Sequence, residues 1–427
     1  MFKYLFYIVL IFLLAACSSP PPKTVLPSDT NMSFIYNPSK TPLHPEVLIY
    51  HESANTSRVY IKIFVVELLF NQANREGTYQ ARVRFRYELR EIHEGVQQQQ
   101  IVDSATVDYT LRRADIRDVF LTTLPIKAEP GKVYSLKLYT TDMLRKKGTV
   151  NYNIVDKVSI HTAQNFKIVS GDTGYPVFDR VFHAGEAFRF QYAGRRIDTI
   201  YIRYFINDFP LPRPPVTNLS SPRPDFIPDS IYAYGYSDTT HFILPYPGMY
   251  HFQVDLKQPD GLTVYNFGET YPRVTTTGDM IGPLAYLSSS VDFNELIQQT
   301  NKKLAVDNFW LQSAGNVSKA REMIRIYYNR VFFANYYFSS YKEGWKTDRG
   351  MMFVIYGPPN KLTKVNGTET WTYFRKKGRE PLRFTFSRYA TPYSDNDYTL
   401  ERNFVNSMWM QAVQEWRSGK VFYADDN

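Results

Sequence analysis

Few residues in this sequence have the types and spacing that enzymatic chemistry requires. The chain has seven histidines, the last of which is His251, so the remainder of the chain contains none. A Ser-His-Asp or Cys-His nucleophile system confined to that remainder is therefore excluded, as is a histidine-ligated zinc site there. The phosphate-binding patterns GxxxxGK[ST] and GxGxxG are both absent. The sequence thus predicts no cofactor, no metal and no catalytic residues.

Carboxylates remain as candidates for chemistry. Asp395 and Asp397 supply oxygen ligands of the kind that Ca²⁺ prefers, but the rest of an EF-hand loop is missing around them, which favours a solvated turn. Two carboxylates brought together by folding are enough for glycoside hydrolysis, and a sequence does not exclude that arrangement. A carboxylate-based hydrolase therefore stays open as an alternative to a protein without enzymatic activity.

The chain's single cysteine, Cys17, ends an N-terminal apolar run. Lys3 followed by the apolar residues 4–16 is typical of a secretory signal, and the run is shorter than the about 20 residues of a membrane-spanning helix. Residues 14–17, Leu-Ala-Ala-Cys, resemble the lipobox of bacterial lipoproteins. The resemblance implies a signal peptide at 1–16 and a diacylglycerol on the sulfur of Cys17. The alternative is an ordinary signal, or a short anchor helix, with an incidental cysteine.

The residues after Cys17 predict where the protein lies. The polar, proline-rich stretch 17–30 is expected to be a flexible lipidated tether. Serine after the cysteine resembles the outer-membrane default, and the acidic run of many surface-exported Bacteroidota lipoproteins is absent. We therefore expect an outer-membrane anchor with the protein facing the periplasm, and exposure at the cell surface is the alternative. The net charge of +9 is modest for 427 residues and, with this compartment, argues against nucleic acid as a partner.

The elements that position these residues are predicted to be mainly β over the first two thirds of the chain. Aromatic residues make up 16% of the sequence, which favours strands. Residues 81–89 alternate between apolar and charged side chains, as in a strand with one buried and one solvated face. A second β-rich stretch covers 166–273. We predict two immunoglobulin-like β-sandwiches, at 31–163 and 164–284.

The last third, 285–427, is predicted to be an α+β domain. Asp292 and Glu295 have capping-box spacing, which predicts the start of a helix. After Ser318 apolar residues recur at intervals of three or four, which predicts a longer helix. Short strands are expected at 352–356, 370–374 and 382–386, and a last helix at 408–416.

One sequence motif carries a family resemblance. The chain reads Gly-Trp-Lys-Thr-Asp-Arg-Gly at 344–350 and Tyr-Gly-Pro-Pro at 356–359, with Phe-Trp at 309–310 and Tyr-Tyr-Asn-Arg-Val at 327–331 upstream. This last third resembles the GWxTD domain of envelope proteins from Bacteroidota. Family members often have a basic, Asp-Pro-containing stretch after the Phe-Trp, whereas 311–314 here are Leu-Gln-Ser-Ala. The family has no assigned activity, so the resemblance implies a compartment and a lineage.

The motif itself has two interpretations. Its glycines permit tight turns, and Trp345 can cover a sheet while Asp348 accepts backbone N–H groups, which would make the motif a corner that defines the fold. Alternatively, Asp348 and Arg349 form a polar site beside the aromatic platform of Trp345, and all three are then candidates for binding a partner.

Two further stretches are candidates for partner binding. Between residues 361 and 388 eight basic residues face two acidic ones, with Arg375, Lys376, Lys377 and Arg379 at its centre. This stretch could meet lipid-A phosphates or an acidic partner, or it is a solvated turn. The proline-rich loop 209–228 is excluded from a sheet interior and is either a surface excursion or a docking segment.

These observations favour a non-enzymatic structural or scaffold subunit of an envelope protein complex, for secretion or outer-membrane assembly. Its expected partners are the bilayer, through acylated Cys17, and other outer-membrane or periplasmic proteins. A glycan- or lipid-binding module is the first alternative, with Trp345 or Trp371 as stacking platforms. A hydrolase of envelope polymers is the second.

Overall fold

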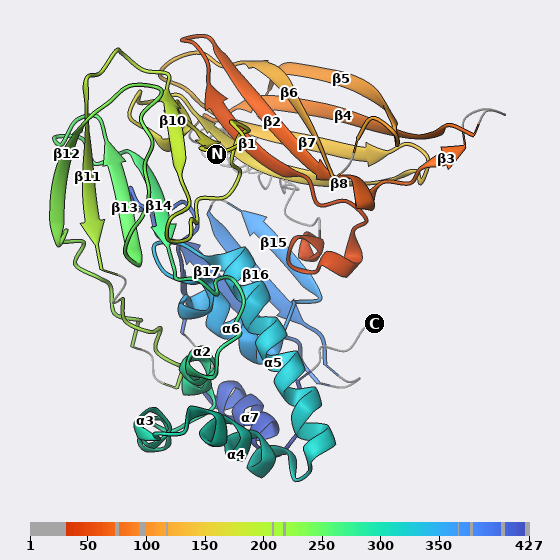
Figure 1. The fold of residues 1–427 in the computed structure, drawn as a ribbon. Coiled ribbons are helices and arrows are strands. Elements are labelled where there is room, and N and C mark those ends of the chain that lie inside the picture. The colour runs from red at the N-terminus through yellow and green to blue at the C-terminus, as the bar shows by residue number, and fades with distance from the viewer. Residues whose placement is uncertain are drawn as a thin grey trace, which may run out of the picture.

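The computed structural model describes residues 31–72, 77–93, 100–116, 118–206, 209–216, 219–365, 367–375, 379–402 and 406–422. The signal peptide and tether with Cys17, and the candidates Lys376 and Lys377, lie outside these residues. Within them the protein is multidomain and mainly β, as predicted, and its α-helices lie in the C-terminal part (Figure 1). None of the described helices is both long and apolar enough to span a membrane.

The first β unit consists of two antiparallel sheets. One contains β1 (Glu46–His51), β2 (Thr56–Phe64) and β6 (Val119–Lys127) in the order β1-β2-β6. The other runs β3-β4-β7-β8, with β5 also paired to β4; its strands are β3 (Asn71–Gln72), β4 (Tyr79–Glu91), β5 (Ile101–Arg112), β7 (Val133–Asp142) and β8 (Lys147–Asp156). The alternation predicted for 81–89 is confirmed, because Ala81, Val83 and Phe85 are fully buried in the core while Arg82 and Arg86 are exposed.

The second β unit follows directly. A two-stranded sheet of β9 (Phe166–Ser170) and β10 (Phe188–Tyr192) accompanies a four-stranded antiparallel sheet in the order β12-β11-β13-β14. The strands of the larger sheet are β11 (Thr199–Phe205), β12 (Ser230–Gly235), β13 (Gly248–Gln253) and β14 (Leu262–Asn266). All residues of β13 and β14 are buried. One face of these strands packs on the unit's own phenylalanine-rich core, and the other packs with Tyr341 of the C-terminal unit.

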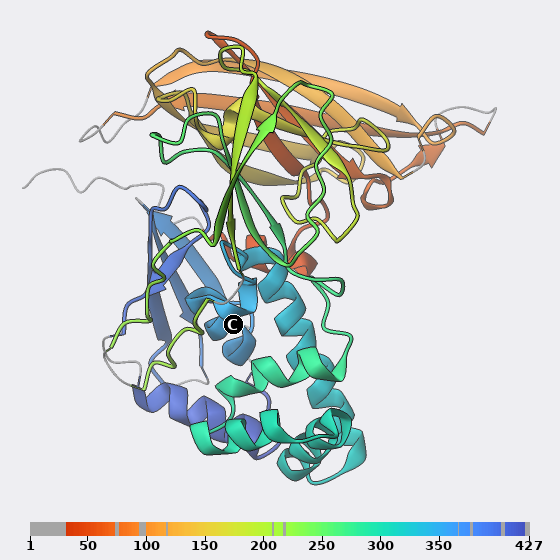
Figure 2. The same ribbon diagram turned by 60° about the vertical axis from the view of Figure 1, so that its left-hand side comes forward.

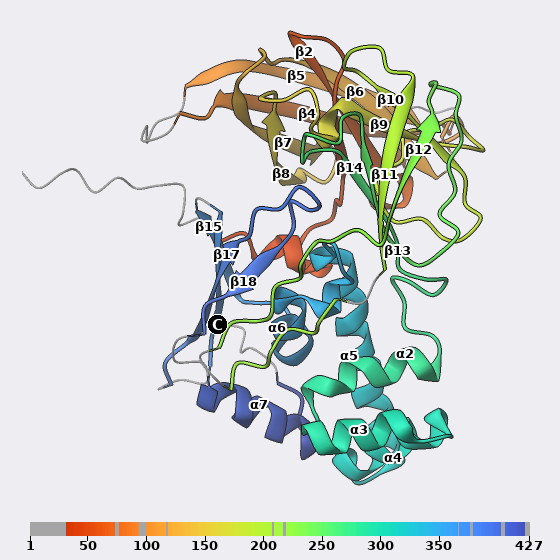
Figure 3. The same ribbon diagram turned by 90° about the vertical axis from the view of Figure 1, so that its left-hand side faces the viewer.

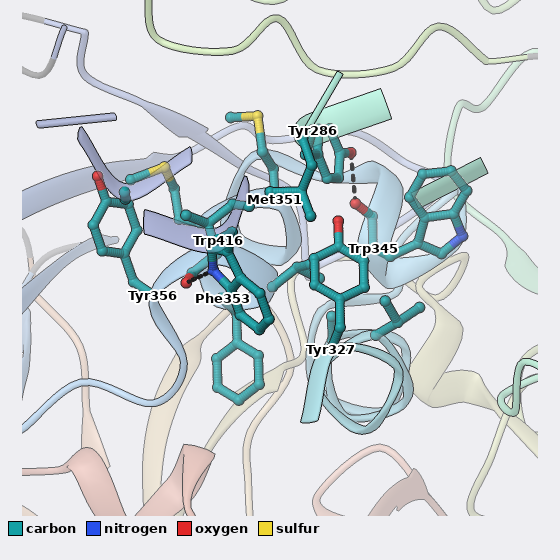
Figure 4. Close-up of a cluster of buried hydrophobic side chains, with 14 of the residues drawn as sticks. Tyr286, Tyr327, Trp345, Met351, Phe353, Tyr356 and Trp416 are labelled. Carbon is teal, nitrogen blue, oxygen red and sulfur yellow. Dashed lines mark hydrogen bonds between the residues drawn. The ribbon is translucent and has the colours of Figure 1, made fainter. Parts of the chain in front are cut away.

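The C-terminal unit combines helices with a four-stranded antiparallel sheet, β15-β16-β17-β18 (Figures 1 and 3). The helices are α2 (Thr277–Ile281), α3 (Ser290–Gln298), α4 (Lys302–Ala314), α5 (Val317–Phe338), α6 (Asp348–Tyr356) and α7 (Asn406–Arg417). The strands are β15 (Lys361–Val365), β16 (Thr368–Tyr373), β17 (Leu382–Arg388) and β18 (Tyr398–Leu400). Figure 4 shows part of the core between them, where Tyr327 and Trp416 lie with their ring centroids 5.2 Å apart.

Short 3₁₀ segments connect these elements. They are Ser33–Tyr36, Pro38–Lys40, Val65–Glu67, Ala163–Asn165, Gly282–Tyr286 and Gly344–Lys346. The first of them lies inside the range 31–163 that was predicted for the first β-sandwich. It packs on the C-terminal unit instead. Met32 N donates to Leu362 O at 2.8 Å, and Asn31 donates to Asn360 O at 2.8 Å. A pairing across some 330 residues leaves no periodic signal in the sequence.

Several predicted elements are confirmed and two are wrong. The helix after Ser318 is α5, the strands at 370–374 and 382–386 are β16 and β17, and the last helix is α7. Helix α3 is capped by Ser289, whose side chain accepts from the N–H of Asp292, so the cap lies three residues before the predicted one. The strand predicted at 352–356 is the end of helix α6. A five-residue apolar run has no periodicity that separates a strand from a buried helix.

Candidate functional site

The GWxTD motif forms the turn that leads from α5 into α6. A Cβ on Gly344 would lie 1.9 Å from Ala334 O, and one on Gly350 would lie 1.8 Å from Gly344 O, so neither position admits a side chain. Between them Thr347 caps α6, because its hydroxyl accepts from Gly350 N at 3.0 Å and donates to Gly344 O at 2.7 Å. These contacts support the interpretation of the motif as a corner that defines the fold.

Trp345 is buried inside this corner. Its backbone N–H donates to Asn335 Oδ1 at 3.1 Å, and its backbone carbonyl accepts from the Tyr286 hydroxyl at 2.8 Å, the bond dashed in Figure 4. Trp371 of strand β16 is fully buried. In this conformation neither indole is exposed as the stacking platform that the glycan-binding alternative expected.

Asp348 is buried and accepts from three groups. Oδ2 accepts from Leu400 N at 2.9 Å, which ties α6 to β18. Oδ1 accepts from Arg402 Nη2 and from the Ser221 hydroxyl, both at 2.8 Å. Both carboxylate oxygens are therefore engaged within the molecule, and one partner, Ser221, comes from the second β unit.

Arg349 lies in a buried cluster of polar groups. Its Nη1 donates to Glu369 Oε1 at 2.9 Å and to the Tyr36 hydroxyl at 3.1 Å, and Nη2 donates to Asn396 O at 2.9 Å. The guanidinium carbon is 4.0 Å from the ring centroid of Tyr398. Arg349 thus joins the N-terminal segment, β16 and the loop before β18 from inside the protein. Like Trp345 and Asp348, Arg349 is buried in this conformation.

Glu369 is the acidic centre of that cluster. Lys364 Nζ lies 2.8 Å from Oε1, and Trp371 Nε1 donates to Oε2 at 3.1 Å. Burial by itself raises the pKa of Glu369, but the charges of Arg349 and Lys364 outweigh burial and hold the pKa at about 2. Glu369 is therefore ionised at neutral pH and has a structural role.

The proline-rich loop packs along the C-terminal unit (Figures 2 and 3). We call its described residues, 209–216 and 219–228, the strap. Lys342 Nζ donates to Pro210 O at 3.0 Å, and Arg402 Nη2 donates to Arg213 O at 2.9 Å. The rings of Phe209 and Phe226 lie 4.9 and 5.0 Å from that of Tyr341. The strap is therefore a docking segment whose binding surface is part of the same chain.

A small polar cavity lies under the strap, lined by Ser221, Lys342, Asp348 and Asp397 among others. Its volume of about 30 Å³ is enough for one or two water molecules. Burial raises the pKa of Asp397 to about 6, against a smaller opposite effect of Lys342, and burial lowers the pKa of Lys342. The solvated turn predicted for Asp395 and Asp397 is therefore wrong for Asp397, which is buried. Asp395 is largely exposed. Two carboxylates, Asp348 and Asp397, and the ammonium group of Lys342 therefore line the same small cavity.

A larger cleft lies where the three units meet. Its volume is about 450 Å³, and we call it the junction cleft. The residues that line it include Glu46 of β1, Phe178 and Asp179 from the segment between β9 and β10, Tyr271, Tyr336 of α5, and Asp395. No cluster of three or more potential metal ligands occurs among the described residues.

The basic stretch is partly neutralised by neighbouring groups. Lys364 pairs with Glu369, Arg388 Nη2 lies 2.6 Å from Asp395, and Arg375 Nε donates to Glu380 O at 2.7 Å. Arg379 is exposed. The described part of this stretch therefore offers isolated cations rather than a continuous basic surface.

A surface that was not expected from the sequence lies on β12. This strand pairs with β11 on one side, and among the described residues no strand pairs with its other edge. The side chains of Ile231, Tyr232 and Tyr234 are 49%, 43% and 48% exposed. The signal was present in the uncharged sequence Ser-Ile-Tyr-Ala-Tyr-Gly, but its position at a sheet edge depends on the fold.

Comparison with known proteins gives a family for part of the chain. Residues 248–418 match the GWxTD domain, so the matched region begins at β13 and includes two strands of the second β unit. No curated protein matches the sequence. Similar solved structures include Bacteroides uniformis beta-glucuronidase 2 covalently bound to cyclophellitol-6-carboxylate aziridine, with 10% identity, a TM-score of 0.18, and coverage of 33% of this chain and 16% of that chain.

Another is a proposed beta-galactosidase from Bacteroides fragilis, with 13% identity, a TM-score of 0.18, and coverage of 34% of this chain and 20% of that one. The chain thus spans a fifth or less of the length of these two proteins. At such TM-scores the two similarities carry no argument about activity.

Proposed function

We propose that this protein, which contains a GWxTD domain at residues 248–418, is a non-enzymatic scaffold subunit of a cell-envelope protein complex. The observation that carries the proposal is the exposed apolar edge of β12. The free edge of a strand presents unpaired N–H and C=O groups, and a partner can add a strand to it. Ile231 and Tyr234 provide apolar contacts beside that edge.

The internal use of the motif supports the same function. Asp348 and Arg349 connect the strap, the N-terminal segment and the C-terminal sheet, so these parts hold one another in place. The cavity beside Asp348 has a volume of about 30 Å³, which is the space of one or two water molecules. A protein whose units are held together by buried hydrogen bonds, and which has an exposed sheet edge, is suited to positioning other proteins.

The sequence supplies the rest of the proposal. The lipobox-like residues 14–17 support lipidation of Cys17, and the serine after it supports an outer-membrane anchor on the periplasmic side. The partners we propose are therefore outer-membrane or periplasmic proteins within reach of the tether.

The test is affinity purification of the tagged full-length protein from gently solubilised membranes, followed by mass spectrometry. We expect a stoichiometric set of outer-membrane proteins with the wild type, and loss of that set with the double variant Ile231→Lys/Tyr234→Lys. Val291→Lys, at a side chain 67% exposed on α3, is the matched control and should retain the set. Thermal unfolding of each variant shows whether its fold is intact. A wild-type protein that is purified alone would contradict the proposal.

A further inference from the structure

The junction cleft has the size and the walls of a small-molecule site. Its volume of about 450 Å³ falls within the roughly 300–1,000 Å³ of typical ligand pockets, which often lie between domains. All three units contribute, through Glu46 of the first, Asp179 of the second, and Tyr336 with Asp395 of the third. The cleft therefore exists only when the three units are assembled.

The charges around the cleft balance. Glu46 pairs with Lys62 at 2.6 Å, and Asp395 pairs with Arg388 at 2.6 Å. Arg180, which also lines the cleft, carries the formal charge opposite to that of Asp179. Glu46 and Asp395 each pair through one carboxylate oxygen, and the other oxygen can accept a hydrogen bond from a hydroxyl. A neutral ligand with many hydroxyl groups matches this wall better than an ion does.

An aromatic ring completes the wall. Tyr336 of α5 is 58% exposed, although it lies in the lining of the cleft. Its ring is held edge-on by Tyr337, with the centroids 5.2 Å apart. An exposed tyrosine ring offers an apolar face for the C–H groups of a sugar ring, beside acceptors for its hydroxyl groups.

We propose that the junction cleft binds a neutral saccharide of one or two rings, with Tyr336 as the stacking platform and Glu46 and Asp395 as hydroxyl acceptors. This site is distinct from the β12 edge, so it adds a ligand to the proposed scaffold. It also differs from a glycan site built on the buried tryptophans of the motif region. A saccharide held here would contact all three units at once and stabilise their assembly.

The experiment is saturation-transfer NMR on the full-length protein with cellobiose, lactose and N,N′-diacetylchitobiose, in a detergent that is not a glycoside. We expect transfer to at least one disaccharide, with a Kd on the order of 1 mM or tighter. Tyr336→Ala should weaken binding about tenfold or more, and Asp395→Ala should weaken it less, because Asp395 lies at the exposed rim. Tyr246→Ala, at another exposed tyrosine outside the cleft, should leave binding unchanged.

Three results would overturn the inference. One is the absence of transfer from any of the three disaccharides up to about 10 mM with folded protein. Another is binding that persists in both Tyr336→Ala and Asp395→Ala. A tetralysine peptide serves as a competitor, and the third result is its displacement of the disaccharide by direct occupation of the cleft, which would assign the site to basic peptides instead. Loss of partner proteins in the Ile231→Lys/Tyr234→Lys variant does not affect this readout, so the two proposals fail separately.

Discussion

The two glycines of the motif, Gly344 and Gly350, cannot be replaced by larger residues without a clash with neighbouring backbone atoms. A Cβ at Gly350 would approach the carbonyl oxygen of Gly344 to 1.8 Å, and that oxygen belongs to a rigid turn. We therefore predict that Gly350→Ala lowers the free energy of unfolding by about 3 kcal/mol, measured by urea denaturation. Gly278→Ala is the control, because its new Cβ would meet nothing closer than Thr276 Oγ1 at 3.7 Å. Equal stability of the two variants would show that the turn can relax.

Glu369 gives the stability of the protein a defined pH dependence. Its pKa is about 2 when folded and 4.5 ordinarily, so its ionised form stabilises the fold above pH 4.5. That contribution is lost as the pH falls from 4.5 through about 2, and its size is on the order of 3 kcal/mol. Arg349, Lys364, Tyr36 and Trp371 face the carboxylate and keep it ionised.

The measurement is urea unfolding of the wild type and of Glu369→Gln between pH 5 and pH 2. At pH 5 the variant should be several kcal/mol less stable, because Arg349 remains buried without its acidic partner. The difference should shrink steadily toward pH 2. A gap that stays constant over this range would show that Glu369 does not titrate as proposed.

At the scale of elements, the strap is the connection between the second β unit and the motif. Ser221 donates to Asp348 and also contacts Arg402 Nη2 at 2.5 Å, so one hydroxyl serves a buried ion pair. We predict that Ser221→Ala costs about 2 kcal/mol and increases amide hydrogen exchange in the strap. Hydrogen-exchange mass spectrometry of peptides within 209–228 checks this. Ser220→Ala changes the exposed neighbouring serine and should leave the exchange as in the wild type.

Elements with a clear period were predictable from the sequence, and contacts between distant segments were not. The alternation at 81–89 has a period of two and identified β4, and the apolar spacing after Ser318 identified α5. The apolar run at 352–356 has no such period, and the Thr347 cap that starts α6 as a helix was not expected from the sequence.

The candidate site was predictable in part for the same reason. The residue types of the glycines and Trp345 predicted a structural corner as one of two interpretations of the motif, and the burial of Trp345 supports that one. The pairing of Asp348 with Ser221, 127 positions earlier, arises from tertiary packing and has no local signal. The exposed edge of β12 likewise depends on which strands pair, so its binding surface became visible only in the folded chain.

At the scale of the whole molecule, polar contacts across units make the three units interdependent. Tyr36 reaches Glu369 across 333 positions, and Ser221 reaches Asp348 from the second unit. The junction cleft takes its walls from all three units. A ligand in that cleft and a partner on β12 would therefore both act on one connected body.

The proposed lipid anchor determines where that body works, and Cys17 is the residue that tests it. Acyl chains contribute about 0.8 kcal/mol per buried CH₂, so several chains on one cysteine hold a protein at a membrane durably.

We predict that the wild type enters the detergent-rich phase of Triton X-114 and that its mature mass exceeds that of the polypeptide from residue 17 by the mass of its acyl groups. Cys17→Ser should remain in the aqueous phase or keep its uncleaved signal, because serine offers no thiol for diacylglycerol transfer. Ser18→Ala is the matched control and should be lipidated normally. A Cys17→Ser protein that is processed and partitions like the wild type would place the membrane attachment elsewhere in the chain and would leave the expected periplasmic partners without a basis.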